Sequence, residues 1–328
     1  MGSTRIKLAA ALAIPTLLLT ACGGQSEETP TDTGSAGGSA AAGGVSGEVR
    51  VDGSSTVGPL TAAASELFKA TPEGASVNVS VGQSGTGGGF QKFCAGETDI
   101  SNASRPIKEE ESATCADAGI DNTEVIVAND ALTVVVNNEN DWATCLTVEE
   151  LNKMWAPEAE GTITNWNQIR DGFPDEKLEL FGAGTDSGTF DYFTDVINGE
   201  EGASRTDYNP SEDDNVTVTG VEGTKGGLGY FGFSYFEENA DKLKAVEIDG
   251  GKGCVAPSAA AVQDGTYVPL ARPLFVYVAK ASMAKPQVAA FVDYYINNLP
   301  AVAEKALFVP LNDDQIATAQ EELATLTS

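Results

Sequence analysis

Three short segments rich in glycine and hydroxyl side chains could bind an anion. They are Gly53–Gly58 (GSSTVG), Gly82–Gly89 (GQSGTGGG) and Gly182–Thr189 (GAGTDSGT). Each lies between a strand-like run and a helix-like run, so it offers hydroxyls and backbone N–H groups at the positive end of a helix. Glycine lets an oxyanion approach the backbone closely. Helix capping is the better interpretation of any single turn. If the fold brings all three together, they predict a cage of neutral donors around one oxyanion.

A fourth segment, Asp99–Pro106 (DISNASRP), adds a positive charge. Ser104 and Arg105 end a strand-like stretch within it. A lone arginine is usually a solvated surface side chain, but this chain has only 19 Lys and Arg against 48 Asp and Glu. We therefore take Arg105 as the candidate for the main positive partner of the anion.

The residues that common catalytic sites require are missing. The chain has no histidine, which excludes Ser-His-Asp triads, Cys-His dyads and histidine-ligated zinc. The P-loop pattern is absent, and residues 82–86 miss the GxSxG pattern because Thr86 is the last residue. No CxxC pair indicates a zinc ribbon or a thioredoxin-like site. We expect no catalytic residue, no metal and no cofactor.

The net charge of -29 is opposite in sign to that of a nucleic-acid-binding protein. We expect no nucleic-acid partner and no charge-driven binding to an anionic membrane. The acidity is interpreted as a solubility feature, with binding of a cationic ligand as the alternative. An acidic protein still binds an anion where local N–H dipoles and an arginine create a positive pocket.

The elements that must position these turns alternate between strands and helices. Period-two and short apolar runs predict strands, and apolar residues at helical spacing predict helices. The alternation predicts an α/β fold with helices covering mainly parallel sheets. The expected strands are 49–53, 76–82, 125–127, 132–136, 178–181 and 275–279, and the expected helices are 61–70, 85–94, 148–155, 190–197 and 286–299.

The N-terminus predicts export. A short basic start precedes the apolar run Leu8–Leu19, which is too short to span a bilayer. Leu19-Thr20-Ala21-Cys22 resembles the lipobox of bacterial lipoproteins, which implies cleavage before Cys22 and lipidation of its thiol. An ordinary signal peptide with an incidental cysteine is the alternative. We expect a signal peptide over 1–21, a lipidated Cys22 with a flexible linker over 22–47, and a lipid anchor that holds the exported protein at the cell membrane, on its outer face or in the periplasm.

At these same residues the chain resembles the PstS family, the phosphate-binding proteins of the high-affinity phosphate ABC transporter. The resemblance implies a type-2 periplasmic-binding-protein fold, in which two α/β lobes joined by two hinge crossings close on inorganic phosphate. It also implies delivery of phosphate to an ABC transporter permease, and we expect a monomer. The crossings are expected near 129–132 and 265–273, with lobe I comprising 48–130 and 270–328 and lobe II comprising 131–269. The segments that carry the resemblance are DGSSTVGPL (52–60), VGQSGTGGGF (81–90), DISNASRPI (99–107), ALTVVVN (131–137), GTDSGTFDYF (184–193), GYFGFSY (229–235) and RPLFVYV (272–278).

The resemblance further implies which residues of the turns bind phosphate. They act through side-chain hydroxyls or through backbone N–H groups. The expected set is Thr56 with Val57 and neighbouring Ser55 from the first turn, Ser84 or Thr86 with Gly85 from the second, and Ser187, Gly188 and Thr189 from the third.

The chain departs from the family at two positions. Ser104 stands where well-known members have an aspartate that accepts a proton from phosphate, and Ala183 stands where they have an arginine. We infer that Arg105 replaces that arginine from the opposite lobe. Asp186 or a backbone carbonyl could accept the proton that distinguishes phosphate from sulfate. Alternatively, Asp186 caps the helix that follows.

Four cysteines remain after Cys22, and in an exported protein they allow three pairings. We expect Cys94–Cys115 and Cys145–Cys254, because each pair lies within one of the lobes that the resemblance implies. Four buried free thiols are the alternative.

Three other functions stay open at this point. The same fold could bind sulfate or molybdate. A surface hydrolase of phosphate esters could use a metal held by carboxylates. A surface sensor or adhesin would keep the same pocket but needs a partner that the sequence does not indicate.

Overall fold

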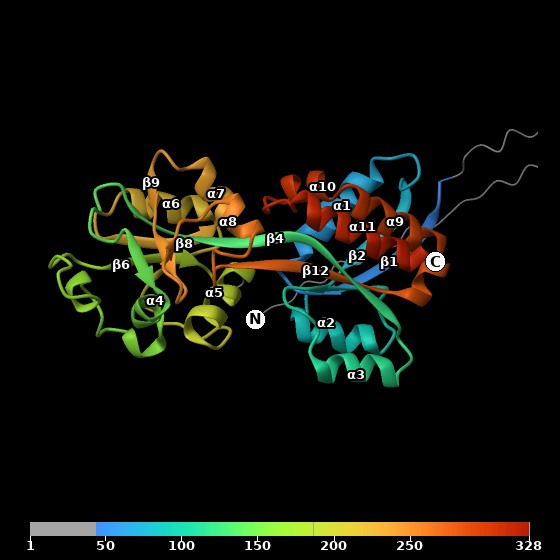
Figure 1. Ribbon diagram of the computed structural model, residues 1–328, viewed down its shortest axis with the longest axis horizontal. Coiled ribbons are helices and arrows are strands. Elements are labelled where there is room, and N and C mark those ends of the chain that lie inside the picture. The colour runs from blue at the N-terminus through green and yellow to red at the C-terminus, as the bar shows by residue number, and fades with distance from the viewer. Residues whose placement is uncertain (1–43, 186, 328) are drawn as a thin grey trace, which may run out of the picture. The chain divides into compact units, whose positions relative to one another are not determined.

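The computed structural model describes residues 44–185 and 187–327. These residues form an α/β structure with two lobes (Figure 1), and each lobe is built around one large hydrophobic core with a smaller cluster of buried apolar residues beside it. The predicted signal peptide, Cys22 and nearly all of the predicted linker lie outside the described residues. The first strand begins at Ser46, slightly before the expected position. Within the described ranges, no helix combines the length and apolar character needed to cross a membrane.

The elements around the first core, which we call lobe I, form a sheet with helices on both faces. They are β1 (Ser46–Gly53), β2 (Ser76–Val81), β3 (Ile100–Ala103), the first part of β4 (Asn122–Asn137), β12 (Ala271–Ala279), α1 (Gly58–Lys69), α2 (Gly85–Cys94), α3 (Glu109–Asp117), the short 3-10 helix Lys280–Ala284, α9 (Pro286–Asn297), α10 (Leu299–Lys305) and α11 (Asp313–Thr327). The helices α1, α9, α10 and α11 bury apolar residues against one face, and Phe90 and Phe93 of α2 pack on the other. Figure 1 shows these two helical layers above and below the sheet.

The elements around the second core, which we call lobe II, use the rest of β4. They are β6 (Glu179–Ala183), β7 (Asn209–Ser211), β8 (Gly227–Gly232), β9 (Leu243–Ala245), α4 (Val148–Trp155), α5 (Gly188–Asn198), α6 (Asp214–Glu222), α7 (Phe233–Glu238), α8 (Ala259–Gln263), the 3-10 helices Pro157–Ala159 and Trp166–Gln168, and a small sheet of β5 (Cys145–Thr147), β10 (Glu247–Asp249) and β11 (Cys254–Val255). Aromatic packing dominates this core: Phe193 stacks on Tyr230 at 3.7 Å, and Trp155 meets Tyr230 edge-on at 5.0 Å.

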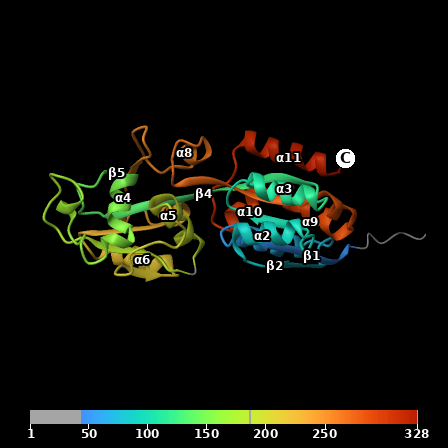
Figure 2. The ribbon, with the colours of Figure 1, turned by 90° about the horizontal axis from the view of Figure 1, so that it is seen from below.

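Strand β4 runs through both lobes (Figures 1 and 2). Its residues 122–131 pair with β12, and residues 132–136 pair with β8. The sequence predicts two strands, 125–127 and 132–136, with Asn129 and Asp130 in the gap between them, but the structure has one strand. Both polar side chains have partners, because Asn129 bonds to Gln315 and Asp130 pairs with Arg272 of β12. The lobes are thus connected through two adjacent, hydrogen-bonded strands.

The main sheet is mixed, which corrects the expectation of mainly parallel sheets. β1 runs parallel to β2 and β3, and β6 runs parallel to β7 and β8. β12 is antiparallel to both β3 and β4, and β4 is antiparallel to β8. The reason is that β12 leads the chain back from lobe II into lobe I, where it lies between strands that run the other way.

All five predicted helices are present, and two have the predicted bounds, α2 and α4. α1 begins at Gly58, before the predicted start, because Pro59 is tolerated in a first turn whose N–H groups have no intrahelical partner. The helix expected over 286–299 ends at Asn297. A new helix, α10, starts at Leu299, and Pro300 occupies its first turn.

One disulfide lies in each lobe. Cys94 of α2 is bonded to Cys115 of α3, and Cys145 of β5 is bonded to Cys254 of β11. Their Cα atoms are 4.3 Å and 6.0 Å apart, respectively. These are the two pairs that the sequence analysis expects.

We expect removal of the Cys145–Cys254 bridge to destabilise the protein more than removal of the Cys94–Cys115 bridge. A disulfide restricts the unfolded chain more when it closes a longer loop, and the sequence separations are 109 and 21. The loop-entropy relation predicts losses of about 5 and about 3 kcal/mol. Chemical denaturation of the two double Cys→Ala variants measures both free energies of unfolding. An equal loss, or a greater loss for the shorter loop, contradicts this expectation.

Candidate functional site

All three glycine-rich turns line a cleft between the two lobes. A larger cavity of about 920 Å³ is lined by the first turn, the second turn, Arg105 and residues of α5. A smaller cavity of about 240 Å³ is lined by the first turn, the third turn and Asp130. Ser55 and Thr56 line both cavities. The first turn therefore borders both cavities, and each of the other two turns borders one of them.

Strand β1 carries the first turn into the cleft. The N–H of Ser54 donates to the carbonyl of Asn102 on β3 at 2.9 Å, and the Ser54 carbonyl accepts from the N–H of Gly58 at 3.0 Å. These bonds fix the turn at both ends. The N–H groups of Thr56 and Val57 have no hydrogen-bond partner among the described residues. They lie at the N-terminus of α1, where an anion is favoured.

An ion pair fixes the second turn against the first. Asp52, near the end of β1, accepts from Lys92 Nζ at 2.6 Å, from the Ser84 N–H at 3.2 Å and from the Ser84 hydroxyl. Burial opposes ionisation of Asp52, but the hydrogen bonds from Lys92 and Ser84 outweigh it and lower the pKa of Asp52. The Ser84 hydroxyl is thus held by Asp52 and does not cap α2.

The next residues of the second turn face the cavity. Gly85 has φ +74°, a backbone conformation that favours glycine, and nothing lies within 4 Å of its missing Cβ. The Thr86 hydroxyl lies 3.1 Å from the Ser104 hydroxyl and accepts from the Ser104 N–H at 3.2 Å. Thr86 and Ser104 therefore form one small polar cluster on the wall of lobe I.

The third turn comes from lobe II and touches the first. Ser187 is the N-cap of α5, and its hydroxyl accepts from the Thr189 N–H at 3.1 Å. A Cβ added to Gly188 would lie 2.6 Å from Thr56 Oγ1 and 3.2 Å from Ser55 Oγ. This approach of the lobes requires glycine. Asp186 lies outside the described residues, so its proposed role as proton acceptor or cap has no structural description.

Arg105 lines the larger cavity, but a carboxylate already occupies its guanidinium. Nη1 and Nη2 donate to the two oxygens of Glu111, each at 2.8 Å, and Nη1 also donates to the Pro106 carbonyl at 3.1 Å. The hydrogen bonds that Arg105 donates to Glu111 raise the pKa of Arg105 despite partial burial. The side chain is 33% exposed. Its assignment as the main cation for an anion stays a prediction.

A second arginine, Arg272, lines the same cavity and was not singled out in the sequence. Its Nη2 donates to the Thr56 hydroxyl at 3.2 Å, and its Nε donates to Asp130 at 3.2 Å. Its guanidinium carbon lies 3.5 Å from the centre of the Tyr192 ring. Arg272 and Thr56 are 216 residues apart in the sequence. The only local signal was an arginine opening an otherwise apolar strand.

Acidic residues of lobe II line part of the larger cavity, namely Asp191, Asp195 and Glu201. Burial, helped by the nearby charge of Glu201, raises the pKa of Asp191, and Arg272 opposes this only partly. Burial also raises the pKa of Asp130 despite its pairing with Arg272. An anion is therefore favoured near the arginines and the turns, and disfavoured along this acidic wall.

The structure brings most of the sequence-predicted residues to the cleft. Val57 is an exception, because its side chain is fully buried in lobe I and lines neither cavity. Only its N–H could serve a ligand. The sequence-predicted residues that line one or both cavities are Ser55, Thr56, Ser84, Gly85, Thr86, Ser104, Arg105, Ser187, Gly188 and Thr189.

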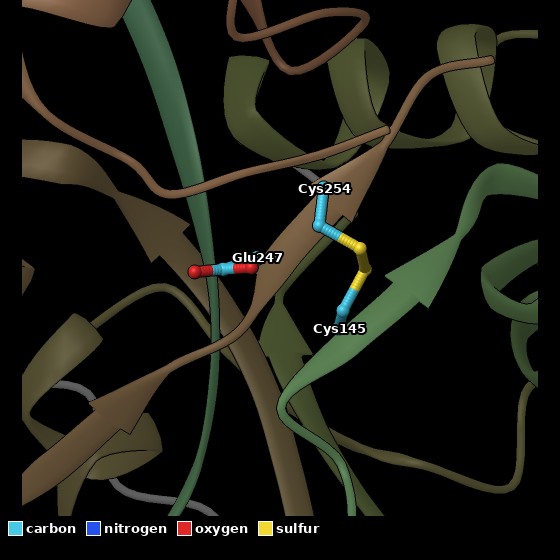
Figure 3. Close-up of side chains that lie close together, drawn as sticks. All are labelled: Cys145, Glu247 and Cys254. Carbon is cyan, nitrogen blue, oxygen red and sulfur yellow. A yellow bond between two sulfur atoms is a disulfide. The ribbon is translucent and has the colours of Figure 1, made fainter. Parts of the chain in front are cut away.

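One cluster has the composition of a metal site without its chemistry. Cys145, Glu247 and Cys254 offer ligand atoms within 4.8 Å of one another. Figure 3 shows that the two cysteines are joined by a disulfide. Their sulfurs are therefore not thiolates, the form of cysteine that binds a metal.

Comparisons with known proteins point to one group. A family model described as "PBP superfamily domain" matches residues 38–298. The chain is 47% identical over 267 residues to the protein SphX of Synechocystis sp., which covers 81% of this chain and 79% of SphX. It is 37% identical over 310 residues to the phosphate-binding protein PstS of Staphylococcus saprophyticus, covering 94% of this chain and 90% of that protein.

Solved structures agree on the fold. A crystal structure described as a possible phosphate binding protein, from Planctomyces limnophilus, is 47% identical, with a TM-score of 0.81 and coverage of 87% of this chain and 100% of that one. An ABC-type phosphate transport receptor from Vibrio cholerae is 20% identical, with a TM-score of 0.61 and coverage of 80% and 100%. The predicted type-2 periplasmic-binding-protein fold is confirmed.

Asp52→Asn is expected to destabilise the protein at neutral pH. The pKa of Asp52 is lower in the folded than in the unfolded chain, so its ionised form stabilises the protein above about pH 4. This contribution disappears as the pH falls through the folded pKa. We expect a loss of about 1–3 kcal/mol at neutral pH and a flatter loss of stability on acidification.

Urea denaturation from neutral to acidic pH measures the change in Asp52→Asn. Asp117→Asn, at an exposed carboxylate of the same lobe, is the control and should behave as the wild type. An Asp52→Asn variant with wild-type stability at neutral pH and an unchanged acid slope would refute the role of this ion pair.

Proposed function

The chain belongs to the PBP superfamily and, within it, to the family of the PstS phosphate-binding proteins, and from this we propose that it binds inorganic phosphate in the cleft between its lobes. The proposed ligands are the hydroxyls and backbone N–H groups of the three turns. Thr56 is the centre of this set, because it lines both cavities and lies closest to Gly188 of the third turn.

One observation carries the proposal. The backbone of Gly188 in lobe II approaches Thr56 of lobe I so closely that a methyl group would not fit between them. Two helix N-termini, those of α1 and α5, therefore meet at one point. Each adds partial positive charge and N–H donors, so a small oxyanion at this point gains donors from both lobes at once.

This arrangement suits a small anion better than a large ligand. The donors are short hydroxyls and main-chain N–H groups, which reach only the atoms directly against them. They replace the hydration shell that phosphate loses when the lobes close. The N–H and O–H dipoles point directly at the ligand, so the site can hold an anion inside a protein of net charge -29.

We propose that binding is coupled to closure of the lobes and to delivery. The connecting strands β4 and β12 allow one lobe to move relative to the other, and a phosphate held by both lobes stabilises the closed form. The closed form would dock on the permease of an ABC transporter. Export and a lipid anchor on Cys22 fit this role, because they keep the protein outside the membrane and next to its transporter.

Because Ser104 stands where an acidic proton acceptor is expected from the family, sulfate is a second candidate ligand. A site that lacks such an acceptor rejects sulfate less effectively, because sulfate carries no proton to donate. Selectivity is therefore part of the proposal. We propose that the chain is a binding protein without catalytic activity, since PstS of Staphylococcus saprophyticus is named as a phosphate-binding protein, the Planctomyces limnophilus protein is described as a possible phosphate binding protein, and the sequence has no histidine.

Equilibrium binding of radiolabelled inorganic phosphate to the mature chain tests the function. We expect saturable one-site binding, with excess unlabelled phosphate competing more strongly than an equal excess of sulfate. Sulfate or molybdate competing better than phosphate would contradict phosphate as the ligand. Turnover of a chromogenic phosphate ester, with or without divalent metal, would contradict the assignment as a binding protein.

Gly188→Ala is expected to lower phosphate affinity by about 10- to 100-fold, which corresponds to about 1.4 to 2.7 kcal/mol. The added methyl would collide with Thr56 and hold the two turns apart. Alanine is otherwise favoured in a helix, so the local helix should not suffer.

Gly232→Ala is the matched control for Gly188→Ala. Gly232 lines the smaller cavity, and nothing lies within 4 Å of a Cβ placed there. Isothermal titration with phosphate should give wild-type affinity for Gly232→Ala. Equal affinities for the two variants would contradict the contact between the first and third turns as the centre of the site.

A further inference from the structure

We propose that the guanidinium of Arg272, on the strand that returns the chain to lobe I, balances the negative charge of the bound anion. We further propose that Asp130 on the adjacent strand positions this guanidinium. This inference rests on the proposed phosphate function and names the residue whose positive charge pairs with the anion. It differs from the expectation that Arg105 has this role.

The location of Arg272 is the first argument. Its Nη2 donates to the hydroxyl of Thr56 at 3.2 Å, and Thr56 is the residue that Gly188 approaches. Its guanidinium also stacks on Tyr192 of α5, the helix that follows the third turn. Arg272 thus contacts both the first turn and the helix of the third turn. An anion bound where these turns meet lies next to its guanidinium.

The free donors of Arg272 are the second argument. A guanidinium has five N–H donors in a planar fork. Arg272 uses Nε for Asp130 and Nη2 for Thr56, and its Nη1 has no hydrogen-bond partner among the residues that the structure describes. By contrast, Arg105 presents its two-pronged edge to Glu111 with two bonds of 2.8 Å. Arg105 must break that pair before it can hold an anion in the same way.

Burial is the third argument. The Arg272 side chain is 18% exposed, against 33% for Arg105. A charge with less water around it interacts more strongly with a ligand. The ring of Tyr192 covers one face of the Arg272 guanidinium, and the Tyr192 hydroxyl is itself fixed by a 2.7 Å bond to the Pro269 carbonyl. The guanidinium is therefore held in place before a ligand arrives.

Asp130 provides the fixed reference for this arginine. Asp130 and Arg272 are directly opposite each other in the ladder between β4 and β12, and the carboxylate is 9% exposed. Of the three guanidinium nitrogens, Asp130 accepts a hydrogen bond from Nε alone. It therefore orients the guanidinium without covering the Nη1 side. A carboxylate here also keeps the empty cleft from presenting an uncompensated buried charge. Since both residues lie on the strands that connect the lobes, the charge stays at the hinge as the lobes move.

Titration of inorganic phosphate into the full mature chain tests the assignment. We expect Arg272→Gln to lower affinity about 100-fold or more, the range measured when one partner of a buried charge pair is removed. Arg105→Gln tests the rival assignment, and its fold-loss of phosphate affinity should be smaller than that of Arg272→Gln by a factor of at least about 10. The control is Arg170→Gln: Arg170 also pairs with a carboxylate, Glu150, and stacks on a ring, Phe173, but lines neither cavity. Its affinity should equal that of the wild type.

Loss of Arg272 leaves Asp130 buried without its partner, so a second variant separates folding from binding. Arg272→Gln/Asp130→Asn removes both charges, and thermal unfolding should show recovered stability while phosphate affinity stays low. Wild-type affinity in this double variant would overturn the proposal, because the orphaned carboxylate would then explain the loss. A greater loss for Arg105→Gln than for Arg272→Gln would also overturn it.

The role of Asp130 is tested by comparing two substitutions. Asp130→Asn keeps an oxygen that accepts from Nε and should bind phosphate at least as tightly as the wild type. Asp130→Ala loses that acceptor and should bind about 10-fold more weakly, the size expected for one lost hydrogen bond to a charged group. Equal affinities for the two variants contradict the positioning role. A wild-type chain that binds no phosphate refutes the proposed function itself, which separates the two failures.

Discussion

The constraint on which this structure depends is the cost of taking an anion out of water inside a strongly acidic protein. With a net charge of -29, long-range electrostatics oppose the binding of any anion. The chain meets this constraint locally, with helix N-termini, short hydroxyl side chains and few full positive charges gathered at one point. The first turn is that point, because both neighbouring turns are arranged around Ser55 and Thr56. The acidic wall of lobe II limits where in the cleft an anion can lie.

The strands that join the lobes also complete the site. β4 and β12 are adjacent along the connection, and the ion pair between Asp130 and Arg272 joins them across the ladder. Arg272 donates hydrogen bonds to Asp130 on the adjacent strand and to the Thr56 hydroxyl of the first turn, and it stacks on the Tyr192 ring of lobe II. Movement of the lobes therefore changes the surroundings of the same charge that would hold the ligand.

Much of this arrangement could be predicted from local sequence. The turns follow from glycine and hydroxyl residues at strand-to-helix junctions, and α2 and α4 have their predicted bounds. The features that were missed depend on contacts between distant segments. Nothing near Asn129 and Asp130 shows that partners from the C-terminal part of the chain keep β4 continuous. Nothing near Arg272 shows that Thr56 lies beside it. The preference for Arg105 ignored Glu111, only six residues away, whose carboxylate occupies the guanidinium.

A crystal structure of the mature chain grown with inorganic phosphate tests the central claim most directly. The account predicts one phosphate between the lobes, within hydrogen-bonding distance of the Thr56 hydroxyl, the Gly188 N–H and the guanidinium of Arg272. Density for phosphate at a surface distant from Thr56, or no bound phosphate with the lobes closed, would contradict it.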